Sequence, residues 1–148
     1  MEHDCDIAIV GGGLNGPALA LAAAQVGLRV IVLDATSHKP QKNAKFDGRA
    51  YALALASKRL MAAVGVWENV AQDAEPMLNI RVSDGRAGVG ASPFFMDFDH
   101  AELEEGPMGY MVEDRHLRYA LQAAMQTSPL IEYRLATRVT GQSTGPEG

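Results

Sequence analysis

The chain has 148 residues, of which 47% are hydrophobic and 21% are charged, and its formal net charge is −5 at pH 7. This composition is typical of a globular domain, and a net acidic chain without a basic cluster argues against nucleic acid as the main partner. Cys5 is the only cysteine, which excludes an internal disulfide and a metal or redox site built on paired cysteines.

The first part of the chain predicts a strand, a glycine-rich loop, a helix and a second strand. Residues 7–10 are a short apolar, β-branched run, which is typical of a strand buried on both faces in a parallel sheet. A helix is expected from Pro17 to Gly27, because proline suits a first helical turn and glycine suits a C-terminal cap. Residues 29–33 predict a second buried strand that ends at Asp34. This order indicates a right-handed βαβ unit, so we expect an α/β fold that starts with a Rossmann-like parallel sheet.

The next segments predict a loop followed by helices. Residues 36–48 are polar and predict a loop. Residues 50–64 have apolar positions at long helical spacings and predict a helix that ends at Gly65. Residues 67–74 predict a second, shorter helix before Pro76.

From residue 77 the pattern changes to partly alternating apolar and polar residues, with a turn signal at Asp84-Gly85. Residues 94–98 predict a returning strand, and residues 109–112 form a third apolar segment. We therefore interpret residues 77–112 as an antiparallel excursion out of the parallel sheet.

The last part of the chain returns to helix and strand. Residues 113–126 predict a helix with one apolar face, and residues 130–133 predict a short strand after Pro129. Residues 137–140 are expected to begin a further strand before the turn-rich residues 141–148. On this interpretation the chain stops inside a hairpin.

Three glycines follow the first predicted strand in the spacing G-x-G-x-x-G, namely Gly11, Gly13 and Gly16. In this motif the first glycine allows a tight turn, the second lets the backbone approach a pyrophosphate, and the third lets helix and strand pack closely. Asp34 follows Gly16 at about the spacing at which a carboxylate binds ribose hydroxyls, and it would repel the 2′-phosphate of NADP. NAD and FAD both stay open, and the alternative is a glycine-rich turn with a solvated aspartate.

Three later blocks resemble one family of flavoproteins. Residues 47–57 with Leu60 and residues 65–67, residues 76–84, and residues 109–117 are similar, in this order, to blocks of the aromatic-ring flavoprotein hydroxylases. The resemblance runs from about Asp6 to Ile131 and is greatest to the ubiquinone-biosynthesis branch, the 2-polyprenyl-6-methoxyphenol hydroxylase family. It implies FAD as the cofactor and NAD(P)H as the co-substrate of a monooxygenase, which uses O₂ to hydroxylate a small phenolic substrate, polyprenylated in this branch.

The resemblance also assigns the cofactor contacts. It places the ADP half of FAD on Gly11, Gly13, Gly16 and Asp34, and the FAD phosphates on Arg49. Arg115 matches a polar position near the ribityl and phosphate groups, and arginine offers a planar fork that suits phosphate. For either arginine the alternative is a surface ion pair, such as that of Arg115 with Glu113 or Asp114. No side chain is identified as a catalytic acid or base.

The resemblance divides the chain into three segments. Residues 1–76 would be the first part of the FAD-binding domain, residues 77–112 a β-rich segment of the substrate domain, and residues 113–148 the return to the FAD-binding domain. Two further motifs of the family are absent and its members are much longer, so we expect an N-terminal fragment that is inactive alone. Two alternatives stay open: another FAD oxidoreductase of the amine oxidase or dehydrogenase type, and a non-catalytic NAD-sensing Rossmann domain.

Metal chemistry and targeting find no support in the sequence. The four histidines are scattered without ligand spacing, so we expect no metal site. The N-terminus is acidic where a signal peptide is basic, and the apolar stretches are too short to span a bilayer. We expect a cytoplasmic protein, with peripheral association with the inner membrane as an open alternative.

Overall fold

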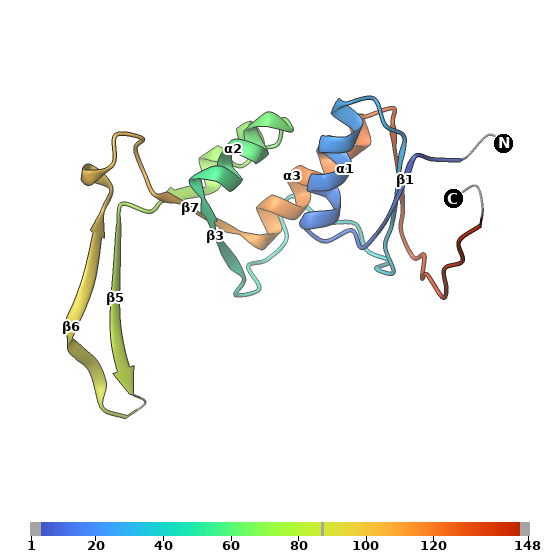
Figure 1. Ribbon diagram of the computed structural model, residues 1–148. Coiled ribbons are helices and arrows are strands. Elements are labelled where there is room, and N and C mark those ends of the chain that lie inside the picture. Colours follow the sequence, from blue (N-terminus) through green and yellow to red (C-terminus); the bar gives the residue numbers. More distant parts are fainter. Residues whose placement is uncertain (1–3, 87, 146–148) are drawn as a thin grey trace.

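A computed structural model of the chain describes residues 4–86 and 88–145. Its elements form a three-stranded parallel sheet with helices packed beside it, a three-stranded antiparallel sheet, and a separate β-hairpin (Figure 1). This arrangement confirms the predicted fold class, a parallel α/β start combined with an antiparallel excursion.

The parallel sheet contains β1 (Ile7–Val10), β2 (Val30–Leu33) and β8 (Ile131–Arg134) in the order β1-β2-β8. The helix α1 (Asn15–Gln25) connects β1 to β2, and α3 (Asp114–Thr127) precedes β8. The two helices pack against each other (Figure 1). The predicted strand–helix–strand unit is confirmed, and α1 ends just before Gly27, whose φ of +87° suits a glycine cap.

The strands of the parallel sheet are buried to different degrees. Val30 and Val32 of the central strand β2 are 1% and 0% exposed. The prediction that residues 7–10 are buried on both faces is wrong, because β1 lies at the edge of the described sheet and its Val10 is 68% exposed. Only Ile9 of β1 is buried in the core.

The antiparallel sheet contains β3 (Ala50–Ala54), β7 (Gly109–Glu113) and β4 (Ala74–Pro76) in the order β3-β7-β4. The prediction of one helix over residues 50–64 is therefore wrong in its first part, and the helix α2 covers only Leu55–Ala63. The alanines of β3 favour helix, but Tyr51 and Leu53 pack against the core and the pairing with β7 overrides that propensity.

The core lies where the helices meet the two sheets. Two single 3-10 turns, Trp67–Asn69 and Ala71–Asp73, replace the short helix predicted for residues 67–74. The first of them buries Trp67, which is 8% exposed. On α3, Leu117, Ala120, Leu121 and Met125 are all 2% exposed or less. The helix predicted for residues 113–126 is thus confirmed together with its apolar face.

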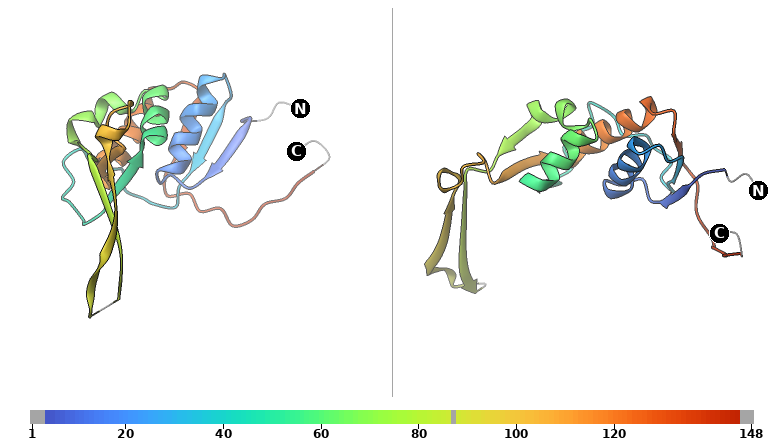
Figure 2. Two further views of the ribbon diagram at one scale, coloured as in Figure 1. Left: turned by 60° about the vertical axis from the view of Figure 1, so that its left-hand side comes forward. Right: turned by 45° about the horizontal axis from the view of Figure 1, so that its top comes forward.

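The strands β5 (Asn79–Arg86) and β6 (Gly90–Asp99) form an antiparallel hairpin, which confirms the predicted excursion. It projects away from the helices in every view (Figures 1 and 2). Asp84-Gly85 is not its turn, contrary to the prediction, because both residues lie inside β5 where the register shifts between Ser83 and Gly85. A 3-10 turn, His100–Glu102, follows the hairpin.

The end of the chain agrees with the sequence in part. The strand predicted at residues 130–133 is confirmed as β8, which pairs in parallel with β2. The further strand predicted from residues 137–140 is wrong, because residues 135–145 contain neither strand nor helix. The last residues of the predicted hairpin, 146–148, lie outside the described residues. Across the described ranges, no helix is long and apolar enough to cross a membrane.

Candidate functional site

The glycine loop that follows β1 is packed closely against its own backbone. The Gly11 N–H donates a 2.8 Å hydrogen bond to the Leu33 carbonyl, and Gly11 has a φ of +115° that favours glycine. A Cβ built on Gly16 would overlap the carbonyl oxygen of Gly11, so only glycine lets α1 start this close to the loop. A glycine loop that leads directly into a helix N-terminus is suited to an anionic group.

Asp34 lies directly after β2, beside this loop. Its Oδ1 accepts a 2.8 Å hydrogen bond from the Thr36 N–H, and its Oδ2 accepts one of 3.2 Å from the Tyr133 hydroxyl on β8. Burial raises the pKa of Asp34, but hydrogen bonds from Thr36, Tyr133 and Gly12 outweigh burial and lower the pKa overall. Burial and the neighbouring Asp34 raise the pKa of Tyr133 to about 12. Asp34 is therefore held as an anion, the form that accepts hydrogen bonds from ribose hydroxyls.

Replacing Tyr133 by phenylalanine is expected to move the pKa of Asp34 up toward its ordinary value, because the carboxylate loses one donor. A carboxyl whose pKa is lowered by folding stabilises the fold above its unfolded pKa, and this contribution is lost as the pH falls through the folded pKa. The variant should therefore protonate Asp34 at a higher pH, which an NMR titration of the side-chain carboxyl carbon measures. Tyr51→Phe, which removes a hydroxyl bonded to Asp114, is the matched control. Equal Asp34 titrations in both variants would contradict the expectation.

Arg49 and Arg115 both line the cavity next to Asp34, and both already contact carboxylates. The Nη2 of Arg49 lies 2.5 Å from Asp47 and 3.1 Å from Asp114, while the Arg49 side chain stays 53% exposed. The Nε of Arg115 pairs with Glu113, and its Nη1 donates to the Ala44 carbonyl over 2.7 Å. Arg115 thus forms one of the ion pairs considered as the alternative from the sequence, and Arg49 is the more accessible of the two.

The cavity around Asp34 has a volume of about 540 Å³ and a net positive lining. Its charged lining residues are five cations and three carboxylates: Lys39, Lys45, Arg49, Arg115 and Arg118 against Asp34, Asp47 and Asp114. A neighbouring cavity of about 680 Å³ is lined by the glycine loop, β3, α2 and α3. The net acidic chain therefore gathers cations beside a backbone loop that is itself suited to an anion.

Four residues of the site were missed in the sequence. Gly12 occupies a free position of the motif, yet a Cβ there would overlap Asp34 and Tyr133. Arg118 lines both cavities, and Asp114 is only 2% exposed although it carries a carboxylate. For Asp114 and Arg118 the only sequence signal is their spacing of four residues, which places both on one helix face. Nothing in the sequence brings Tyr133 to Asp34, because they are 99 residues apart.

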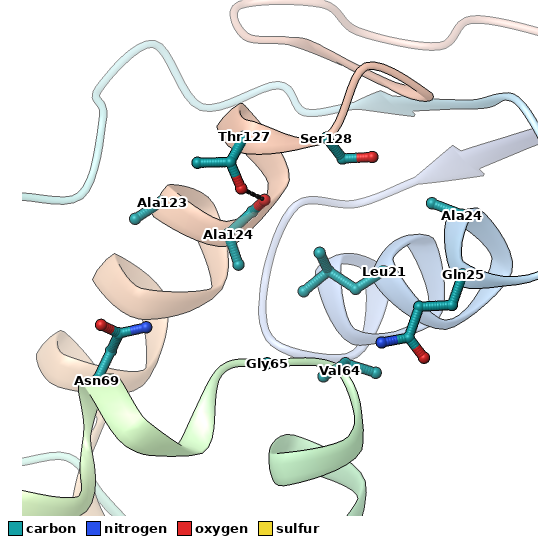
Figure 3. Close-up of a pocket in the computed structure, with 10 residues that line it drawn as sticks. All are labelled: Leu21, Ala24, Gln25, Val64, Gly65, Asn69, Ala123, Ala124, Thr127 and Ser128. Carbon is teal, nitrogen blue, oxygen red and sulfur yellow. Dashed lines mark hydrogen bonds between the residues drawn. The ribbon is translucent and has the colours of Figure 1, made fainter.

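A third hollow lies between α1, α3 and the segment after α2 (Figure 3). It adjoins Leu21, Ala24 and Gln25 in the C-terminal half of α1, and none of the described residues that line it is charged. The C-terminal end of a helix disfavours anions. The candidate site for a phosphate-containing ligand is therefore at the opposite end of α1. Within residues 4–86 and 88–145, no group of three metal-ligating side chains is found.

One family model matches nearly the whole chain, and curated proteins are similar to it in sequence. A family model described as FAD binding domain matches residues 4–148. Ubiquinone hydroxylase UbiL from Rhodospirillum rubrum is 41% identical over 135 residues, which cover 91% of this chain and 30% of that protein. The 3-demethoxyubiquinol 3-hydroxylase of Escherichia coli is 35% identical over 132 residues, which cover 88% of this chain and 32% of that protein. The chain thus spans about a third of the length of these relatives.

Solved structures show the same fold. The p-nitrophenol 4-monooxygenase PnpA from Pseudomonas putida DLL-E4 superposes with a TM-score of 0.66 at 20% identity, over 88% of this chain and 31% of that chain. The flavin-dependent monooxygenase PieE was solved in complex with FAD and substrate. It superposes with a TM-score of 0.62 at 19% identity, over 89% of this chain and 24% of that chain. At these identities the likeness establishes the fold of the chain.

Proposed function

Because the chain belongs to the FAD binding domain family, we propose that it forms the FAD-binding part of a flavin-dependent monooxygenase that hydroxylates a phenolic substrate. The observation that carries the proposal is the close-packed glycine loop beside an anionic Asp34 and a cation-lined cavity. This set of groups complements a dinucleotide, which combines ribose hydroxyls with a pyrophosphate. The relatives named as ubiquinone hydroxylases support a polyprenylated phenol and a place in ubiquinone biosynthesis.

The fit to FAD can be tested residue by residue. Asp34 would accept from the ribose hydroxyls, and Gly11, Gly13 and Gly16 would let backbone N–H groups approach the pyrophosphate. Arg49 and Arg115 would contribute cationic donors from the wall of the same cavity. When bound, FAD supplies the redox and oxygen-activating chemistry, for which we propose NAD(P)H and O₂ as co-substrates. The chain itself binds and orients the nucleotide.

The proposal extends to the organisation and location of the protein. We propose that residues 1–76 and 113–148 belong to the FAD-binding domain and that residues 77–112 belong to a substrate domain. The projection of β5 and β6 away from the helices supports this division. We further propose a cytoplasmic protein with peripheral contact with the inner membrane, where a polyprenylated substrate would reside. The family match favours FAD over the NAD-sensing alternative.

The 148-residue chain is expected to bind FAD weakly and to leave NADPH unoxidised, because it spans only about a third of its relatives. Titration of FAD followed by flavin fluorescence measures the first, and NADPH absorbance measures the second. NADP and NAD serve as competitors, and NADP should compete least because Asp34 repels a 2′-phosphate. A chain that binds NAD more tightly than FAD would contradict the proposed function. A preparation with stoichiometric FAD that oxidises NADPH would contradict the expected weak binding and inactivity of this chain, but not the proposed function.

A further inference from the structure

We propose that Arg118 is a further ligand of the pyrophosphate at the glycine loop, and that the buried carboxylate of Asp114 is the positioning residue that holds Arg118 and Arg49 there. This inference rests on the proposed binding of a dinucleotide. It assigns a binding role to a residue on α3, an element that the glycine motif does not include. It also explains why a carboxylate is buried beside a site for an anion.

Arg118 is placed between the two cavities at the glycine loop. It lines the cavity around Asp34 and also the cavity that contains Gly11, Gly13 and Gly16. Its Nη1 is the nearest group to Gly13, 4.0 Å from a Cβ built on that residue. The Nε donates to Asp114 over 2.7 Å, and among the described residues the Nη groups have no hydrogen-bond partner. A guanidinium held through Nε presents its remaining donors as a fork, which matches the oxygens of a phosphate.

Asp114 connects this arginine to two other elements. Its side chain is 3% exposed and contacts three groups. The Tyr51 hydroxyl on β3 donates to Oδ1 over 3.0 Å, while Oδ2 lies 2.7 Å from the Arg118 Nε and 3.1 Å from the Arg49 Nη2. A buried carboxylate is retained only when such partners compensate for its lost hydration. Arg118 is 32% exposed and Arg49 is 53% exposed, and both line the cavity around Asp34 while they contact Asp114.

The charge of the whole cavity supports a role in binding over a purely structural one. Asp114 contacts two arginines and Asp47 pairs with Arg49, so these two carboxylates balance the two arginines. The complete lining of the cavity around Asp34 still has more cations than carboxylates. This net positive lining lies beside the loop whose backbone already suits an anion, and a pyrophosphate would supply negative charge there.

The test compares ADP with adenosine as probes, because only ADP carries phosphates. In the full 148-residue chain, Arg118→Gln is expected to weaken ADP binding about tenfold, the range of a charge-assisted hydrogen bond, and to leave adenosine binding unchanged. Asp114→Asn should weaken ADP binding by a smaller factor, again without changing adenosine. Isothermal titration calorimetry measures the affinity of the wild type and of each variant for ADP and for adenosine. Arg59→Gln is the matched control, because Arg59 is exposed and pairs with Glu105 outside both cavities.

The outcomes separate this inference from the function on which it rests. Equal losses for ADP and adenosine, or unchanged ADP binding in Arg118→Gln, would overturn the role of Arg118 while leaving dinucleotide binding intact. A wild-type chain that binds neither FAD nor ADP would overturn the proposed function and this inference together. Arg118→Lys keeps the charge but removes the fork, and an intermediate loss for ADP is expected from it. Circular dichroism shows whether each variant is folded. If Arg118→Gln does not fold, the ADP affinity of Arg118→Lys tests the role of Arg118 instead.

Discussion

Replacing Gly16 by alanine is expected to destabilise the chain by about 3 kcal/mol, the upper part of the range for an overpacked site, and to abolish nucleotide binding. The new Cβ would overlap the carbonyl oxygen of Gly11 and approach the side chain of Ile9. Gly11 cannot easily move away, because its N–H is bonded to the Leu33 carbonyl on the neighbouring strand. A urea unfolding curve gives the free energy of unfolding, and an FAD titration gives the loss of binding.

Whether Gly16→Ala stabilises or destabilises the chain distinguishes close packing against Gly11 from helix propensity. Gly16 lies inside α1, where helix propensity alone predicts that alanine stabilises the chain by about 1 kcal/mol. Gly13→Ala is the control for stability, because its Cβ would meet only the Arg118 Nη1 at 4.0 Å. We expect this variant to unfold within about 1 kcal/mol of wild type. A Gly16→Ala chain as stable as wild type would show that the close approach of helix and loop is not a requirement.

Trp67→Ala is expected to lower the free energy of unfolding by about 3–5 kcal/mol, the usual cost of truncating a buried aromatic side chain. Trp67 is 8% exposed and joins the segment after α2 to the antiparallel sheet. Its ring meets that of Tyr110 on β7 edge to face, with centroids 4.9 Å apart. A tryptophan-to-alanine change leaves a cavity that the short 3-10 turn around it cannot close. Thermal or urea unfolding followed by far-ultraviolet circular dichroism measures the loss.

Two companion variants show which contact of Trp67 matters. Trp67→Phe keeps an aromatic edge for Tyr110 and should recover much of the lost stability. Lys58→Ala removes the side chain whose ammonium lies 5.3 Å from the ring centroid, and a loss of about 0.5–2 kcal/mol is expected for a cation–π contact of this kind. If Lys58→Ala destabilised the chain as much as Trp67→Ala, burial of the ring would not be the main contribution.

The sequence predicts the elements whose local patterns agree with their tertiary environment. The run of residues 30–33 is apolar and mostly β-branched, and it forms the buried central strand β2. The error at Ala50–Ala54 has the opposite cause, because an alanine-rich segment with helix propensity becomes a strand only through pairing with β7, far along the chain. Asp84-Gly85 has the composition of a turn, but the strand continues past it through a register shift that depends on β6.

The candidate site also contains residues that the sequence predicts and residues that it does not. Gly11, Gly13, Gly16 and Asp34 follow a local motif, and the structure brings them together as the motif requires, although their contact with a ligand stays a prediction. Arg118, Asp114 and Tyr133 follow no motif. Their positions depend on how α3 and β8 dock beside the loop, and a single sequence does not encode that docking in any short pattern.

The hydrogen bond between Asp34 and Tyr133 has a consequence for the order in which the chain becomes functional. The two residues are 99 positions apart, and β8 is the last strand of the described chain. During synthesis the βαβ start leaves the ribosome long before β8, so it is exposed with an incomplete sheet and without the Tyr133 hydroxyl beside Asp34. On the proposed role of Asp34, ribose recognition would begin only when a late, long-range strand pairing has formed, which is a slow kind of step in folding. Nucleotide affinity would thus report the completion of the parallel sheet.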